Sequence, residues 1–341
     1  MAAITTVAAK KPVILAPIHA NAGIEAAYRV KLNKLIAEMA RSYEYWIAVQ
    51  WNRKPPATTL AHDSNTEDGP DPKPWWSEMP SVKGMAAQMA RLGTYWEAKF
   101  SEAAPKLAEY FSRTVANRSE TVLKDILRQG GIGIDYRMTA GAKAVMQSTT
   151  AENVSLIKSI QTEYHQQVNG AVMRAVQRGN DLTSLQAELK ERYPITKRRA
   201  ELIARDQCSK ATAAINEQRQ TEAGIVYGYW QHSGGARHPR RHHVAVHGKL
   251  FKIAEGLQLR DPGPNGKLRW VKPGKDVNCN CTWRPIIPRR DAAGNMIVPP
   301  AEDAGMRARL ARQREMGGMG IMPDKSDNTP PRARRTKSKS R

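Results

Sequence analysis

Several kinds of residue are scarce in this chain of 341 residues, and each scarcity excludes a class of protein. Three cysteines are too few for a disulfide framework, so we expect a reducing compartment, the cytoplasm, as the place of synthesis. No apolar run approaches the roughly 18 residues of a membrane span, so we expect no membrane partner. The apolar start is interrupted by Lys10 and Lys11. A secretory signal carries its positive charge before the apolar part, so we do not expect this segment to be one.

Acidic residues are also few for the number of basic ones. The chain has 54 Lys and Arg against 32 Asp and Glu, a net charge of +22. The excess is concentrated in residues 181–341, where 32 basic residues face 16 acidic ones. Such a surplus repels itself unless a polyanion is near, and nucleic acid is the commonest polyanion. The charge therefore favours proximity to DNA, and a basic surface without a dedicated ligand is the alternative.

Apolar residues recur at three- and four-residue steps through most of the first 223 residues, which predicts helices. We expect an N-terminal helical segment over 1–51, a helical region over 85–149, and a long helix from Glu152 to Arg178. Because proline removes a helical hydrogen bond, Pro105 is expected to begin a new helix and Pro194 to end one.

Residues 52–84 have a different composition, rich in proline, acids and small polar side chains. This composition predicts a flexible insertion between the first two helical regions. Trp75 and Trp76 are the exceptions within it. Tryptophans in a polar loop either pack back onto their own domain or anchor a partner, and both interpretations stay open.

After Gly224 the sequence changes to β-forming residues and glycine turns. Strands are expected within residues 225–230, 248–253 and 267–271. The predicted fold class is therefore α+β: a helical N-terminal two-thirds is followed by a small α+β or β-rich module. The basic tail over 289–341 is expected to be largely disordered.

The tail ends in a dense run of positive charge, RARRTKSKSR. Its basic residues are Arg332, Arg334, Arg335, Lys337, Lys339 and Arg341. They are either solvated or in contact with DNA, because phosphate contacts depend on such charge density.

Five of the eight histidines lie within sixteen residues, and two of the three cysteines follow as a pair. Imidazole and thiolate are ligands that zinc prefers, and four of them close a tetrahedral site. His243, His247, Cys279 and Cys281 form a chemically sensible set, and a closed set indicates a structural zinc ion. The alternative is a basic histidine loop with cysteines packed as small apolar groups.

Four short motifs follow one another between residues 150 and 288. They are Ile203–Ala204–Arg205, Trp230, Arg240 with His243 and Gly248, and Asn278–Cys279–Asn280–Cys281. Their order resembles the phage Mu F-like minor head proteins, the phage head morphogenesis domain. The resemblance assigns residues 150–288 to that domain. The chain departs from the family at Asp206–Gln207, where threonine and glutamate are usual, and it lacks a preceding Cys-x-x-Cys.

The resemblance implies a minor head (capsid) protein of a tailed bacteriophage. Its implied partners are the phage portal protein, other head proteins and packaged double-stranded DNA, inside the capsid or at the portal vertex. Residues 85–149 are then the candidate portal-docking part. No Walker loop, GxGxxG, HExxH or GxSxG motif is present, so no catalytic residue is assigned and no enzyme is expected. The alternatives are a metal-dependent nuclease, a toxin-like transferase, or a free DNA-binding accessory protein.

Overall fold

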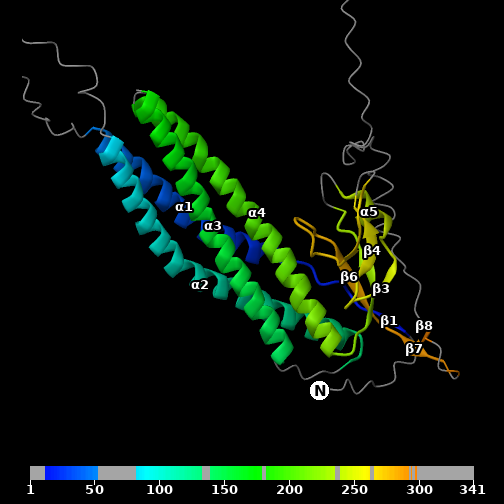
Figure 1. Cartoon of the computed structure of the whole chain (residues 1–341). Helices are drawn as coiled ribbons and strands as arrows, with labels where there is room; N and C mark the ends of the chain where they lie inside the picture. Colours follow the sequence, from blue (N-terminus) through cyan, green and yellow to red (C-terminus); the bar gives the residue numbers. More distant parts are fainter. Residues whose placement is uncertain are drawn as a thin grey trace, which may run out of the picture. The chain divides into compact units, whose positions relative to one another are not determined.

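The structure is a computed structural model that describes residues 12–297 apart from 53–81, 133–138, 179–181, 235–238, 262–264, 292 and 294–295. Its helices are α1 (Ala22–Trp51), α2 (Val82–Gln129), α3 (Ala140–Arg178), α4 (Leu182–Glu222) and α5 (Arg241–Ala245). Its strands are β1 (Val13–Ile14), β2 (Tyr227–Gln231), β3 (Leu250–Lys252), β4 (Leu257–Arg260), β5 (Leu268–Val271), β6 (Thr282–Ile287), β7 (Arg289–Arg290) and β8 (Met296–Ile297). Figure 1 shows these elements.

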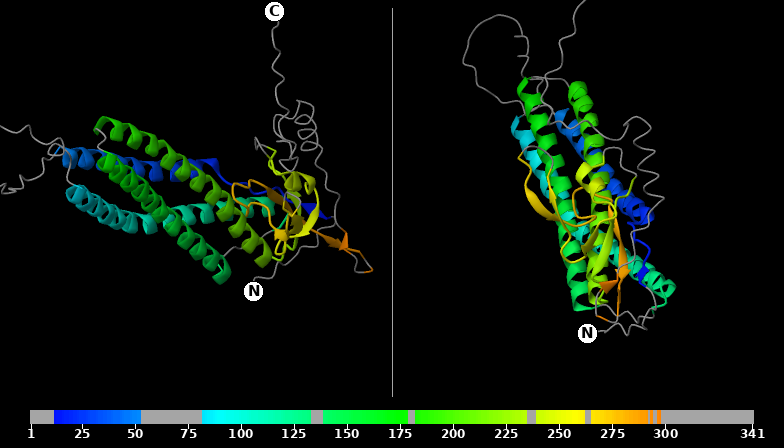
Figure 2. Two further views of the ribbon diagram at one scale, coloured as in Figure 1. Left: turned by 45° about the horizontal axis from the view of Figure 1, so that its top comes forward. Right: turned by 90° about the vertical axis from the view of Figure 1, so that its right-hand side faces the viewer.

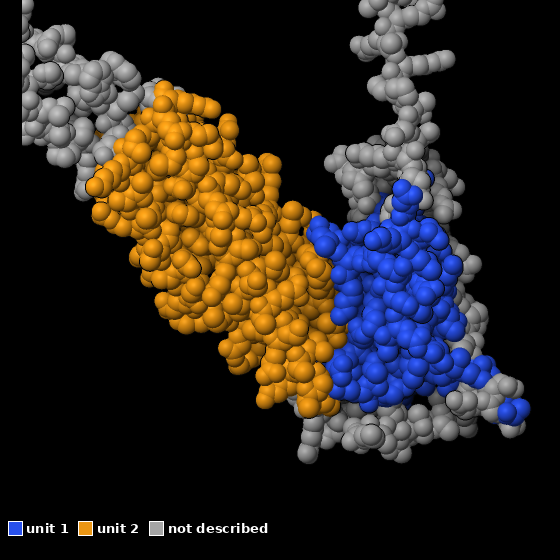
Figure 3. Space-filling model, in the orientation of Figure 1, with its two compact units in different colours: residues 1–19, 122–135, 216–341 blue, residues 20–121, 136–215 orange. Residues whose placement is uncertain are grey.

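The chain forms two compact units, which Figure 3 shows in different colours. The helical unit contains residues 20–121 and 136–215, and the sheet unit contains residues 1–19, 122–135 and 216–341. The predicted fold class is confirmed, because long helices are followed by a small antiparallel sheet. None of the helices in the described ranges is long and apolar enough to cross a membrane.

Four long helices lie side by side in the helical unit, as Figures 1 and 2 both show. Aromatic side chains fill the space between them. Tyr28 of α1 stacks on Phe111 of α2 with ring centroids 4.4 Å apart, and Tyr43 meets Tyr164 of α3 edge-on at 5.4 Å. All four of these rings are buried, so the three- and four-residue periodicity marks the helix faces that form this core.

Two prolines that were expected to break helices lie inside them. Pro105 is within α2 and Pro194 is within α4. Each helix buries apolar side chains on both sides of its proline, such as Phe100 and Phe111 in α2. An interior proline costs about 3 kcal/mol, and burial of two or more such side chains offsets that cost. The predicted breaks are therefore wrong, because the local signal is weaker than the tertiary packing.

A buried chain of polar groups joins three helices of the same unit. The hydroxyl of Tyr28 donates to Oδ1 of Asn153 at 3.0 Å. The Nδ2 atom of Asn153 donates to Oε1 of Gln207 at 2.9 Å, and Nε2 of Gln207 donates to Oε1 of Glu152 at 2.9 Å. Asn153 and Gln207 are 0% and 1% exposed. Because unpaired polar groups are costly in a core, this series of hydrogen bonds fixes how α1, α3 and α4 align.

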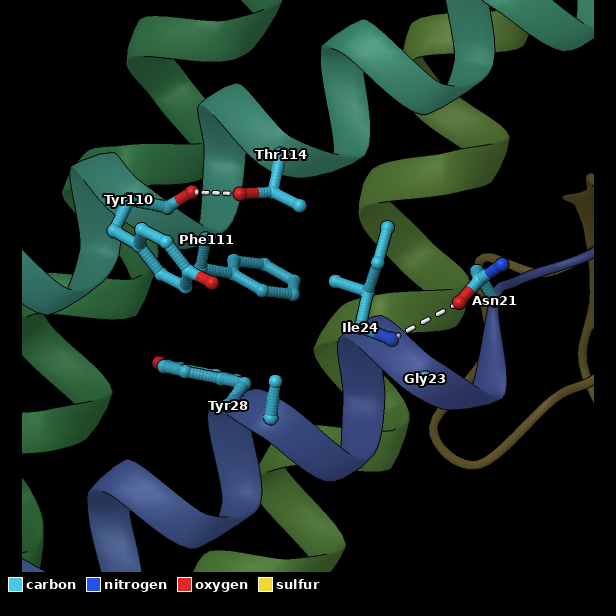
Figure 4. Close-up of a pocket in the computed structure, with 8 residues that line it drawn as sticks. Asn21, Gly23, Ile24, Tyr28, Tyr110, Phe111 and Thr114 are labelled. Carbon is cyan, nitrogen blue, oxygen red and sulfur yellow. Dashed lines mark hydrogen bonds between the residues drawn. The ribbon is translucent and has the colours of Figure 1, made fainter.

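A small hollow lies between α1 and α2 near the start of α1 (Figure 4). The stacked rings of Tyr28 and Phe111 line it together with Tyr110 and Ile24. Asn21, which also lines the hollow, caps α1 by accepting a hydrogen bond from the Ile24 backbone N–H. The hollow has a volume of about 220 Å³, which is smaller than a typical small-molecule site of about 300–1,000 Å³.

The sheet unit is built around β6, in a four-stranded sheet of order β1-β6-β2-β3. Every pairing is antiparallel, and Trp230 of β2 lies opposite Trp283 of β6. A separate hairpin is formed by β4 and β5. Gly228 in β2 allows the Trp283 side chain to pack closely against the β2 backbone, because a Cβ atom there would lie 2.8 Å from Cδ1 of Trp283.

The sequence predicted β2, β3 and β5 but not the central strand β6 or the short strands β1 and β4. β6 follows directly after the cysteine pair and contains Pro285, so its local pattern does not indicate a strand. The helix α3 also begins at Ala140, earlier than the expected start at Glu152. The helix α2 begins at Val82, inside the segment expected to be an insertion.

Candidate metal centre

A histidine and two cysteines from separate segments of the sheet unit bring their donor atoms together. Nδ1 of His243 lies 3.5 Å from Sγ of Cys279 and 3.7 Å from Sγ of Cys281. The three residues are buried, with 2%, 3% and 6% of their surface exposed. Tetrahedral zinc bonds of about 2.0 Å to nitrogen and 2.3 Å to sulfur would place the two atoms about 3.6 Å apart. The donor set and its spacing therefore fit three ligands of one tetrahedral ion.

A tight turn presents the cysteine pair. The backbone N–H of Cys279 donates to the carbonyl of Asp276 at 2.9 Å, which closes the turn. Asn278, inside it, has a φ of 56°, and the other described residues with positive φ are all glycines. Asparagine tolerates this left-handed conformation better than most side chains do. The asparagine of the Asn-Cys-x-Cys motif thus has a backbone role: it turns the chain so that both thiols face His243.

Replacing Asn278 by valine is expected to destabilise the sheet unit by about 1–3 kcal/mol, because a β-branched residue is strained at positive φ. Asn278→Gly is the matched control and is expected to cost less, since glycine adopts this conformation freely. Thermal unfolding followed by near-UV circular dichroism measures both. Equal losses in the two variants would show that the asparagine side chain, rather than the backbone angle, matters there.

His243 is placed by the short helix α5 and by two motif residues. The guanidinium of Arg240, just before α5, donates from Nη2 to the carbonyl of Val277 at 2.7 Å. This bond ties the start of α5 to the cysteine turn. The ring of Trp230 meets His243 edge-on with centroids 5.4 Å apart. Side chains from β2, α5 and the loop before β6 therefore enclose one buried cluster.

The two thiols differ in acidity because they share one hydrogen bond. A hydrogen bond from the Cys281 thiol and the neighbouring His243 lower the pKa of Cys279. The same contact and burial raise the pKa of Cys281. Thiolate is the form of cysteine that binds metals.

An acid that belongs to none of the sequence motifs lies on the other side of the His243 ring. Nε2 of His243 is 3.2 Å from Oδ2 of Asp276, within ion-pair distance but not aligned as a hydrogen bond. A hydrogen bond from the Arg269 guanidinium lowers the pKa of Asp276. The signal available in the sequence was the position of Asp276, two residues before the Asn-Cys-x-Cys motif.

The structure brings together three of the four predicted zinc ligands. Among the described residues, the group that includes the two thiols contains His243 but not His247. Nδ1 of His247 instead accepts a hydrogen bond from the backbone N–H of His232 at 3.1 Å. His232 is 3% exposed, and burial lowers its pKa, which favours the neutral ring. His242 belongs to a second group with His243 and Asp276.

The remaining motif residues have separate positions. Gly248 has a φ of 76°, and its N–H donates to the Trp230 carbonyl at 2.8 Å, so it closes the turn from α5 toward β3. Arg205 belongs to the helical unit, where it is exposed on α4. The basic residues from Arg332 to Arg341, and the pair Trp75 and Trp76, lie outside the described residues.

Comparison with known proteins agrees with the motif order. Residues 166–284 match the family model described as Phage Mu protein F like protein. An uncharacterized protein of Haemophilus influenzae is 31% identical over 240 residues, 67% of this chain and 51% of that protein. The uncharacterized protein YqbB of Bacillus subtilis is 21% identical over 199 residues, 56% of this chain and 63% of that protein.

The matched segment contains all four motifs and every donor of the buried cluster. It is therefore similar to a phage Mu F-like domain, as the resemblance predicted. Residues 166–284 of this chain belong to the Phage Mu F-like family. The chain spans about half the length of the first relative and under two thirds of the second. No solved structure matches it significantly.

Proposed function

We propose that this chain is a minor head protein of a tailed bacteriophage, located at the portal vertex or inside the capsid. There it assists head assembly and the packaging or delivery of DNA. The family match over residues 166–284 carries the proposal. A catalytic role is not proposed, because the candidate centre is buried and both of its thiols face His243.

Charge supports contact with packaged double-stranded DNA. The sheet unit exposes basic side chains on α5, in or just before β3, and on the β4–β5 hairpin. They are Arg241, Lys249, Lys252, Arg260 and Lys267. The C-terminal run from Arg332 adds six more basic residues in the last ten. Contacts of this kind bind phosphate without reading sequence, which suits a protein that meets whatever DNA is packaged.

Exposed aromatic residues support docking of the helical unit on the portal protein. Tyr45 and Trp46 of α1 and Tyr95 of α2 are 61%, 42% and 52% exposed. They line a groove of about 750 Å³ together with Arg41 and Arg91. Tyrosine, tryptophan and arginine are the residue types most enriched at the centres of protein interfaces. The α2 part of this groove falls within residues 85–149, the segment predicted to dock.

The portal proposal is tested by co-sedimentation of the purified chain with portal rings. The wild-type chain is expected to sediment with the rings, and the double variant Y45A/Y95A is expected to bind at least tenfold more weakly. Each lost aromatic anchor costs on the order of 1–2 kcal/mol at an interface. Tyr110→Ala is the matched control, because Tyr110 is 46% exposed on the same helix α2 but does not line the groove.

Failure of the wild-type chain to bind the rings would contradict the portal association. Equal weakening by Tyr110→Ala would show that the groove is not the docking surface. Neither result would affect the family assignment of residues 166–284.

We also propose that the buried cluster holds a structural zinc ion. His243, Cys279 and Cys281 supply three ligands. His247 is the proposed fourth, through Nε2, since its Nδ1 already accepts from the His232 backbone. An ion closed by four protein ligands has no open position for substrate, so it would join the loop before β6 to α5.

A further inference from the structure

The imidazole of His243 lies between two different chemical environments. Its Nδ1 atom faces the thiols of Cys279 and Cys281, while its Nε2 atom faces the carboxylate of Asp276 at 3.2 Å. A neutral imidazole carries its proton on only one nitrogen. A carboxylate beside Nε2 stabilises the proton on that atom, which leaves the lone pair of Nδ1 directed at the thiols.

Asp276 is itself held rigidly by a hairpin that contributes no candidate ligand. Nη1 and Nη2 of Arg269, on β5, donate to its two carboxylate oxygens at 2.9 and 2.8 Å. Nε of the same guanidinium donates to Oδ1 of Asp261, just after β4, at 2.8 Å. Two parallel bonds between a guanidinium and a carboxylate fix both the position and the plane of the acid.

We infer that Asp276, clamped by Arg269, is the positioning residue of the metal centre. This inference rests on the zinc site proposed above. The carboxylate selects the His243 tautomer and ring orientation that point Nδ1 at the ion. The β4–β5 hairpin, through Arg269, is thereby part of the metal site although it holds no ligand.

The chain offers a matched pair of acids for testing this role. Asp276 and Asp261 both bond to the Arg269 guanidinium, but the described contacts place only Asp276 against His243. Asp276→Asn keeps the shape of the side chain and removes the negative charge beside Nε2. Asp261→Asn makes the same chemical change one step further from the ring.

The experiment measures zinc affinity of the full-length chain by competition with a chelating dye, and the absorption spectrum after loading with Co²⁺. Asp276→Asn is expected to weaken zinc binding by about 10- to 100-fold, the range found when such outer residues are removed. Its Co²⁺ spectrum is expected to differ from that of the wild type. Asp261→Asn is expected to leave the spectrum unchanged and the affinity within about threefold.

Each contrary result has a separate meaning. Wild-type affinity in Asp276→Asn would overturn the positioning role and leave the zinc site standing. Equal losses in both variants would also overturn it, because they would indicate a general effect of loosening Arg269. A wild-type chain that binds neither zinc nor Co²⁺ would instead reject the zinc site itself. If Asp276→Asn does not fold, Arg269→Gln gives the same comparison. We then expect Arg269→Gln to weaken zinc binding, and an unchanged zinc affinity would contradict the positioning role.

Discussion

Replacing Cys281 by serine is expected to abolish zinc binding and to destabilise the sheet unit by at least about 4 kcal/mol. The thiol of Cys281 is buried 3.7 Å from Nδ1 of His243, so its loss removes one of the proposed ligands. Because the metal would join α5 to the loop before β6, the unit would lose both the ion and its main cross-connection. Zinc content by elemental mass spectrometry and thermal unfolding by near-UV circular dichroism measure the two effects.

Cys208→Ser is the matched control for this prediction. Cys208 is also a buried cysteine, 1% exposed, but it belongs to the helical unit, where its thiol donates to the Asn21 carbonyl at 3.6 Å. The control is expected to keep its zinc. Treating the wild type with a chelator is expected to reproduce the Cys281→Ser transition. A wild-type chain that contains no zinc and does not respond to the chelator would contradict the metal proposal.

Replacing Asn153 by leucine is expected to destabilise the helical unit by about 3 kcal/mol. Leucine would leave the Tyr28 hydroxyl without its acceptor and Oε1 of Gln207 without its donor, all within the core. Urea unfolding followed by the helical circular dichroism signal measures the loss. Tyr28→Phe removes only the outer link of the chain and is expected to cost about 1 kcal/mol.

Asn117→Leu is the surface control, because Asn117 is exposed on α2 in the same unit. It is expected to change stability by less than about 0.5 kcal/mol. A loss at Asn153 no larger than the loss at Asn117 would contradict the view that the buried polar chain aligns the helices.

Gln207 shows how a departure from a family pattern gains a physical reason from the structure. In the family pattern a glutamate is usual at this position. In the fold it is 1% exposed, and its amide accepts from Asn153 while donating to Glu152. A carboxylate could accept but could not donate, and it would face the charge of Glu152. Glutamine is therefore the side chain that completes this buried chain.

The sequence predicted those parts of the fold that depend on local pattern. The helices follow apolar periodicity, and the strands β2, β3 and β5 follow β-forming residues and glycine turns. β6 was missed because its strand character depends on pairing with β1 and β2, which are distant in the sequence. The breaks expected at Pro105 and Pro194 were wrong for a related reason, since burial in a shared core outweighs the cost of a proline.

The candidate site could be predicted in its ligand types but not in its geometry. Residue chemistry identified His243, Cys279 and Cys281, which the fold does bring together. It could not identify the proposed roles of Asp276 and Arg269, because these depend on the contacts of Asp276 with His243 and with Arg269, which only the fold brings together. His247 was chosen by spacing alone, and its described contact is with the His232 backbone, so its role as a ligand stays a prediction.

The central claim is that this chain is a component of the phage head. Quantitative mass spectrometry of purified particles, before and after DNA release, tests it most directly. We expect a few copies of the chain per particle, at or below the number of portal subunits. Loss of the chain after release would add that it leaves with the DNA. Complete absence of the chain from mature particles would contradict the claim.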